Sequence, residues 1–109
     1  MEFFKNQKGS AKKMKIEIYQ INTNRDKRHV KFIDLVTTEI DPSIYDLVFA
    51  GEVDAADPED VFWIFNERLP EGYAGHSMSV SDVVHVLSGG KVQNGYYFCA
   101  SFGWKKIDF

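Results

Sequence analysis

Short apolar runs, dense in aromatic residues and separated by turn residues, occupy the last third of the chain. The runs are residues 83–87, 96–102 and 104–109, with turns at residues 88–90, at residues 94–95 and at Gly103. Runs of this length bounded by glycine and asparagine are typical of strands, and the short turns favour antiparallel pairing of neighbouring strands. The sequence therefore predicts a three-stranded antiparallel meander at the carboxyl end.

Two further strands are predicted earlier in the chain. Residues 14–21 alternate, with Met14, Ile16 and Ile18 on one side and charged residues between them, which indicates a half-buried strand. Residues 45–53 form a second apolar run, whereas residues 30–36 fit either a short strand or a helical turn. We expect residues 14–21 to be an edge strand that is able to pair with a copy of itself, so a monomer and a homodimer both stay open.

One helix is predicted over residues 58–69. Asp57 suits the N-cap position because its carboxylate accepts the free amide hydrogens of the first turn, and Pro58 suits the first helical position. Pro70 and Gly72 end the helical pattern. The fold class that follows is α+β, a mainly antiparallel sheet of about five strands with one main helix packed across it.

Trp63 lies on the polar side of this predicted helix, away from the face formed by Val61, Phe62 and Phe65. Two interpretations of its role stay open. Either the side chain is buried under a neighbouring loop or the amino-terminal tail, or it is an exposed aromatic anchor of the kind found in binding hot spots.

Length and composition predict one domain. Residues 1–13 are lysine-rich, lack periodicity and predict a flexible basic tail, whereas residues 14–109 hold the predicted domain. The chain has one cysteine, Cys99, and no apolar run typical of a signal peptide or a membrane span. The sequence therefore predicts a cytoplasmic protein without a membrane partner.

Charge is distributed unevenly, although the formal net charge is only −3. Residues 1–33 carry nine lysines and arginines against three acids, whereas residues 34–71 carry eleven acids against one arginine. Such an acidic segment either keeps a small domain soluble or meets a basic partner, for example the nucleic-acid channel of another protein.

The sequence contains none of the common metal-ligand or nucleophile patterns. The histidines His29, His76 and His85 have no cysteine or acid at metal-ligand spacing. The segment GHSMS at residues 75–79 lacks the second glycine of a hydrolase nucleophile elbow, and the residues after it predict a strand where the elbow needs a helix. We therefore predict no catalytic, metal or cofactor site.

A structural role is expected for the short polar side chains of this segment, because they can hydrogen-bond nearby backbone groups and fix an irregular turn. These residues are Ser77, Ser79, Ser81 and Asp82. Cys99 lies in an aromatic run without a basic neighbour, which predicts a buried, inert thiol. A Mg²⁺-dependent nuclease remains a weaker alternative, for which Glu52 and Asp54 come nearest to a carboxylate pair.

Several segments together resemble the YodL-like family, small domains of Firmicute chromosomes and mobile elements. The segments are KIEIYQI, YDLVFAGEV, the helix start DPEDVF, GHSMSVSDVV and YYFCASFGW. The last two carry most of the resemblance, which extends from Lys15 to Phe109. The resemblance implies an α+β domain carried by conjugative elements and phages, often beside antirestriction genes, and it implies no catalytic residue.

Mobile-element context and an acidic segment lead to a first hypothesis, a non-enzymatic inhibitor of a host defence nuclease. Like an anti-CRISPR protein, it would place its acidic face in the nucleic-acid groove of a Cas nuclease or ribonucleoprotein. The residues predicted to bind this basic partner are Glu52, Asp54, Asp57, Glu59, Asp60, Trp63 and Glu67. The alternative is a nucleic-acid-binding accessory module that uses the basic first third and the aromatic tail.

Overall fold

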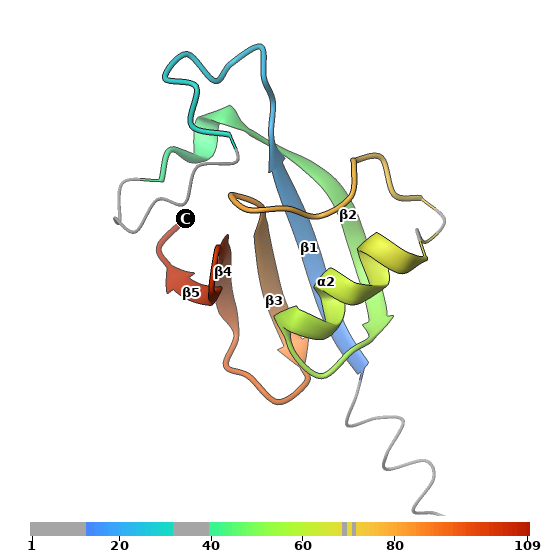
Figure 1. Cartoon of the computed structure of the whole chain (residues 1–109). Coiled ribbons are helices and arrows are strands. Elements are labelled where there is room, and N and C mark those ends of the chain that lie inside the picture. Colours follow the sequence, from blue (N-terminus) through green and yellow to red (C-terminus); the bar gives the residue numbers. More distant parts are fainter. Residues whose placement is uncertain (1–12, 32–39, 69, 71) are drawn as a thin grey trace, which may run out of the picture.

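Five strands form one antiparallel sheet in the computed structural model, in the order β2-β1-β3-β4-β5 (Figure 1). The structure describes residues 13–31, 40–68, 70 and 72–109. The strands are β1 Lys13–Ile21, β2 Tyr45–Asp54, β3 Val83–Gly89, β4 Gly95–Ala100 and β5 Gly103–Ile107. The described chain also contains one α-helix, α2 Pro58–Glu67, and a short 3₁₀ helix, η1 Pro42–Ile44. These elements confirm the α+β class and a sheet of five antiparallel strands.

The first strand lies in the interior of the sheet, so the prediction that it forms an edge is wrong. β1 pairs with β2 on one side and with β3 on the other, and β2 and β5 are the edge strands. Sequence order did not reveal this, because β2 and α2 lie between β1 and β3 in the sequence, whereas β3 pairs directly with β1 in the sheet. Among the described strands, the two edges of the sheet that could pair with another chain are therefore those of β2 and β5.

Tight turns join the last three strands, as the sequence predicts. β4 is shorter than predicted, because residues 101–102 form the turn into β5 and Ala100 pairs directly with Gly103. Gly103 has a φ of 122°, a conformation that L-residues with a side chain rarely adopt. The glycine thus permits a two-residue turn at this point.

One face of the sheet carries the larger core cluster. Met14, Ile16 and Ile18 are fully buried there together with Val61 and Phe65 of α2. The ring of Phe65 packs edge-on against Phe49 and Tyr73, with centroids 4.9 Å apart in each case. Alternation along β1 therefore supplies the apolar row predicted for this strand, and α2 supplies side chains to the same cluster.

A second cluster, built around buried Val83 and Phe98, lies on the other face of the sheet. Register explains why, because Val83 pairs with Tyr19, which alternates with the first core row. Phe109 closes this cluster, with its ring centroid 5.1 Å from Tyr19 and Tyr45 and 5.0 Å from Tyr96. Both faces of the sheet are therefore partly covered.

Some predictions fall outside the described residues. They concern the tail up to residue 12, most of the ambiguous segment 30–36, the last predicted helical residue Leu69, and the acids Asp34, Glu39 and Glu71. Within the described chain, β1 begins at Lys13, the helix ends at Glu67, and no helix is long and apolar enough to span a membrane.

Candidate interaction surface

Helix α2 is fixed at its start by two carboxylates that serve the backbone. The amide of Asp60 donates to Oδ1 of Asp57 over 2.9 Å, and the amide of Ala56 donates to Oδ2 of Asp60 over 2.9 Å. Such reciprocal contacts satisfy amide hydrogens that have no partner inside the helix. Asp57 and Asp60, both predicted to bind a partner, are therefore already used in the fold.

The outer side of α2 exposes Trp63, whose relative exposure is 58%. The indole borders a hollow of about 390 Å³, which Phe62, Met78 and Glu67 also line. The side chain is therefore exposed, which the interpretation of Trp63 as a binding anchor requires and the interpretation of burial under a loop does not. Glu67 is exposed one helical turn further along the same side.

The turn between β4 and β5 presents Phe102, whose side chain is fully exposed. It borders a second hollow of about 410 Å³, together with Trp104, Phe62 and Glu59. Phe102 contributes to neither of the two core clusters formed by the described residues. The sequence analysis assigned Phe102 to a strand and did not predict its exposure. Its position directly before Gly103, a turn residue, was the signal that could have indicated a place in the turn.

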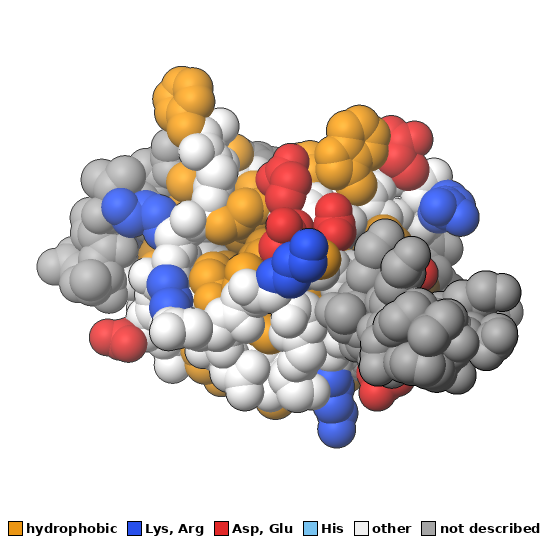
Figure 2. Space-filling view, turned by 90° about the horizontal axis from the view of Figure 1, so that it is seen from below, with side chains coloured by type: hydrophobic (Ala, Val, Ile, Leu, Met, Phe, Trp, Pro, Cys, Tyr) orange, Lys and Arg blue, Asp and Glu red, His pale blue; other side chains and the backbone are white. Residues whose placement is uncertain are grey.

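Glu59 and Phe62 belong to both hollows and connect them. The indole N–H of Trp104 donates to Oε1 of Glu59 over 3.1 Å, and the Phe62 and Trp104 rings meet edge-on at 6.5 Å. We name this surface the aromatic–acidic face. It consists of Glu59, Phe62, Trp63, Glu67, Phe102 and Trp104. Figure 2 views the molecule from below and shows hydrophobic side chains projecting at two places, with acidic side chains between them.

The other two predicted partner-binding residues, Glu52 and Asp54, lie on β2 at a different surface. They pair in register with Lys15 and Lys13, whereas Met14, between these lysines, points into the core beneath α2. Because successive strand residues point to opposite faces, Glu52 and Asp54 face away from α2. The acidic segment therefore does not form one continuous face.

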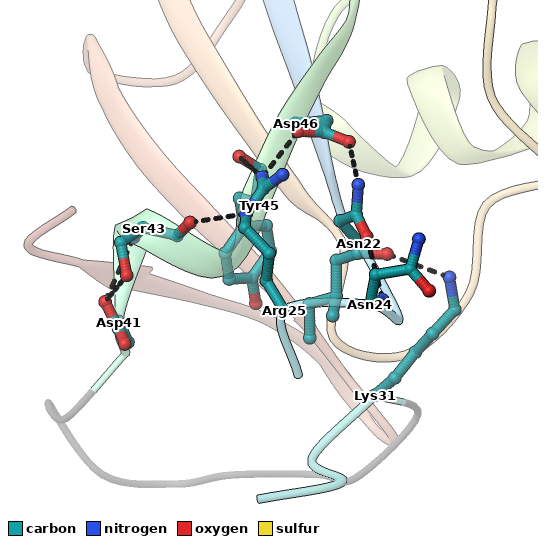
Figure 3. Close-up of polar contacts among 9 residues, drawn as sticks. Asn22, Asn24, Arg25, Lys31, Asp41, Ser43, Tyr45 and Asp46 are labelled. Carbon is teal, nitrogen blue, oxygen red and sulfur yellow. Dashed lines mark hydrogen bonds and ion pairs between the residues drawn. The ribbon is translucent and has the colours of Figure 1, made fainter. Parts of the chain in front are cut away.

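Two more acids of this segment, Asp41 and Asp46, hold the chain around the loop after β1 (Figure 3). Asp41 accepts from the hydroxyl of Ser43 over 2.7 Å and from its amide over 3.0 Å at the start of η1. Asp46 accepts from Arg25 over 2.5 Å and from Asn22 over 2.8 Å. These contacts hold the pKa of both aspartates below its ordinary value.

The basic residues of the same loop are partly used in the fold as well. The Arg25 guanidinium donates to the carbonyls of Ser43 and Tyr45, and the Lys31 ammonium donates to the carbonyl of Ile21 (Figure 3). Lys27 and Arg28 remain exposed at the rim of a cavity of about 540 Å³. Lys27 and Arg28 are therefore the side chains of this loop that could contact an anionic ligand at the cavity.

The polar segment predicted to be structural is anchored by a buried network. Asp82 is 1% exposed, and its Oδ2 accepts from the amide of Ser79 and from the Gln20 side chain, each over 2.9 Å. Gln20 also donates to the carbonyl of His76 and to the Tyr73 hydroxyl, each over 2.9 Å. Burial raises the pKa of Asp82 to about 7 despite these hydrogen bonds.

The remaining members of the segment differ in their contacts. Ser81 has a φ of 86°, and its carbonyl accepts from the Tyr45 hydroxyl over 2.7 Å. The Ser79 hydroxyl is buried and has no hydrogen-bond partner among the described residues, whereas Ser77 is exposed. Gln20, the centre of the network, was missed because an isolated glutamine in an alternating strand gives no signal of its partners.

One carboxylate–histidine pair lies on the sheet face opposite α2. Nδ1 of His85 lies 2.8 Å from Oε1 of Glu17, and the imidazole stacks on Tyr96 with centroids 3.9 Å apart. The contact with His85 lowers the pKa of Glu17. Tyr19 also donates to Glu17 over 2.8 Å, so the carboxylate bridges neighbouring side chains of the sheet. Among the described residues, no group of three acids, histidines or cysteines is arranged to hold a metal ion.

Comparison with known proteins identifies the family. The family model of the YodL-like domain matches residues 15–109, which is most of the chain. None of the curated proteins and none of the solved structures matches the chain. The matched range begins in β1, after Lys13 and Met14, and ends with Phe109, so it includes most of β1 and all of the later strands and helices described above. The chain therefore belongs to the YodL-like domain family.

Proposed function

We propose that this YodL-like domain is a non-enzymatic binding protein that docks a basic partner protein on its aromatic–acidic face. The observation that carries the proposal is the exposure of Trp63 and Phe102 on either side of Glu59. Exposed large aromatic side chains around a common centre are typical of interface hot spots. The proposal takes α2 as packed across the sheet, which the core contacts of Val61 and Phe65 support.

The class of partner follows from charge. Glu59 and Glu67 give the face a negative character, and a complementary basic surface would speed association and fix orientation. Grooves that hold nucleic acid are basic for the same electrostatic reason. We therefore propose that the partner is a nucleic-acid enzyme of host defence, such as a guide-RNA-loaded Cas nuclease, and that the domain acts as its inhibitor within a mobile element.

Alanine variants of the two exposed aromatic residues test the docking surface. Trp63→Ala and Phe102→Ala should each weaken binding to a guide-RNA-loaded Cas nuclease about 30-fold, the effect of losing a hot spot of about 2 kcal/mol. Leu47→Ala is the matched control, because Leu47 is 51% exposed but lies on β2, away from the face. Binding and the rate of DNA cleavage are measured together.

Charge reversal tests the electrostatic part separately. The double variant Glu59→Lys with Glu67→Lys should weaken binding at low salt, and raised salt should weaken binding of the unmodified domain. Glu52→Lys with Asp54→Lys on β2 carries the same change of net charge and is the control. Equal effects of the control and of Glu59→Lys with Glu67→Lys would refute the role of this face. If the domain neither binds the Cas nuclease nor slows its cleavage of DNA, that nuclease is excluded as the partner.

A second candidate function is binding of nucleic acid, which the exposed Lys27 and Arg28 beside the 540 Å³ cavity favour. If phosphates are bound there, Lys27→Glu with Arg28→Glu should abolish binding of a single-stranded oligonucleotide, and affinity should fall steeply with salt. Lys105→Glu with Lys106→Glu, on β5, is the matched control for the basic loop. Affinity that these loop reversals leave unchanged would exclude the site.

A further inference from the structure

The outer edge of β2 is open over its second half. At Val48 the edge is covered, because the amide of Ala74 donates to the Val48 carbonyl over 3.0 Å. Over residues 49–54, the described chain pairs with β1 alone. Natural edge strands are commonly protected by charged residues, proline or a covering segment. Residues 49–54 contain no proline, and their charged residues, Glu52 and Asp54, are both acidic, so they would disfavour an acidic strand and attract a basic one. This stretch can therefore accept a further strand.

The two sides of this edge differ in chemistry. Ala50, Glu52 and Asp54 are exposed on the side that faces away from α2, so a carboxylate stands at every second position toward the end of the strand. On the other side, a hollow of about 390 Å³ is lined by Val53, Ile64, Arg68 and Pro70 as well as Asp54. An added strand would place its alternate side chains beside the carboxylates and over this hollow.

We infer that the β2 edge binds an extended segment of a partner protein in which basic and apolar residues alternate. Main-chain hydrogen bonds would supply affinity, and the carboxylates and the hollow would select the alternate side chains, as in other cases of β-strand addition. A second copy of β2 fits poorly, because it would bring its own Asp46, Glu52 and Asp54 to the same edge. This site is separate from the aromatic–acidic face.

Synthetic peptides test the inference directly. The probe is a seven-residue peptide that alternates lysine and valine, and the controls are a glutamate–valine alternation and a peptide with the same lysines and valines in two blocks. In an amide NMR titration of the full chain, the alternating basic peptide should bind at least tenfold more tightly than either control. Its largest shifts should fall on residues 49–54 and on Ile64.

Backbone and charge changes distinguish strand addition from simple charge attraction. Two N-methylated peptides are compared, one methylated at the odd positions and one at the even positions; we call these the two methylation phases. Only one of the two sets of amides points at β2, so one peptide should bind about tenfold more weakly and the other should keep its affinity. Glu52→Lys with Asp54→Lys should lower affinity about tenfold, whereas Glu59→Lys with Glu67→Lys should not change it.

Three results would overturn the inference. They are equal binding of the block peptide, equal tolerance of both methylation phases, or self-association of the chain with shifts at the β2 edge. None of them bears on the aromatic–acidic face, whose own variants are tested with a different partner. The two proposals can therefore fail separately.

Discussion

Gln20 and Asp82 are joined by a buried hydrogen bond of 2.9 Å that links positions 62 residues apart. Gln20 belongs to β1, and Asp82 is the last residue before β3, so the bond ties the irregular segment before β3 to the centre of the sheet. The Gln20 side chain also accepts from the amide of His76 over 3.1 Å. One amide side chain thus holds both ends of the segment from His76 to Asp82.

Truncation of the Gln20 side chain should therefore lower the free energy of unfolding by more than truncation of an exposed glutamine. Gln20→Ala removes one of the hydrogen bonds of the buried Asp82 carboxylate and the acceptor of the His76 amide. Because hydrogen bonds to a buried charged group contribute more than average, we expect a loss of about 1–3 kcal/mol in the free energy of unfolding. Gln93→Ala, an exposed glutamine on the turn before β4, should change stability by less than about 0.5 kcal/mol. Urea unfolding of both variants measures the difference, and equal losses would contradict the role of Gln20.

The raised pKa of Asp82 predicts a pH dependence of stability. Because the folded-state pKa is about 7 and the unfolded value is 3.8, the folded chain binds this proton more tightly. The stabilisation is complete below about pH 4 and is lost as the pH rises through about 7. Asp82→Asn should remove this fall in the unfolding free energy between pH 4 and 7. An unchanged pH profile in the variant would exclude Asp82 as its source.

Two glycines with positive φ provide a matched test of backbone packing. At Gly89, with a φ of 86°, an added Cβ would lie 2.0 Å from the carbonyl oxygen of Lys13, which is backbone and cannot move away easily. At Gly72, with a φ of 83°, it would meet no atom of the described residues within 4 Å. Both alanine variants carry the conformational cost of about 1 kcal/mol, and Gly89→Ala should lose clearly more. Thermal unfolding compares them, and equal losses would be inconsistent with the close approach.

Exposure predicts that the aromatic–acidic face contributes less to folding than the buried core does. Phe102→Ala should change the free energy of unfolding by less than about 0.5 kcal/mol, and Trp63→Ala, which loses a partly buried indole, by about 1–2 kcal/mol. Phe65→Ala, fully buried against Phe49, should lose about 3–5 kcal/mol. Guanidinium unfolding gives all three values. A large loss for Phe102→Ala would mean that its ring packs in solution and is not available to a partner.

The N-cap of α2 gives a further test. Asp57→Ala removes the acceptor of the Asp60 amide and should lower the free energy of unfolding by about 0.5–2 kcal/mol, while Asp57→Ser should retain most of it. Glu67→Ala, an exposed acid at the other end of the helix, is the control for loss of charge. Far-ultraviolet circular dichroism during denaturant unfolding reports the change, and a stable Asp57→Ala variant would show that the cap is dispensable.

Local sequence patterns were sufficient to predict most of the individual elements. The alternation of Met14, Ile16 and Ile18 marks a core row, and Asp57 with Pro58 marks the helix start, because these signals arise within a few residues. The order of the strands could not be read in the same way. Insertion of β3 beside β1 depends on contacts between distant segments, which leave no local trace in the sequence.

The candidate surface was predictable only in part. Trp63 stands out because a large aromatic residue on the polar side of a helix is either covered by another segment of the chain or exposed for contact with a partner. Glu52 and Asp54 were grouped with the helix because they are near it in sequence, but strand alternation turns them to the opposite face. Phe102 went unnoticed because a shift of two residues at the end of β4 decides whether its ring lies in a strand or at the tip of a turn.

The central position of β1 constrains how the chain can fold as it leaves the ribosome. β1 can pair with β2 once about half of the chain has emerged, but its partner on the other side, β3, comes much later; Glu17 and His85 are 68 residues apart. Until then one edge of β1 stays open in the nascent chain, since pairing that spans a long loop forms slowly.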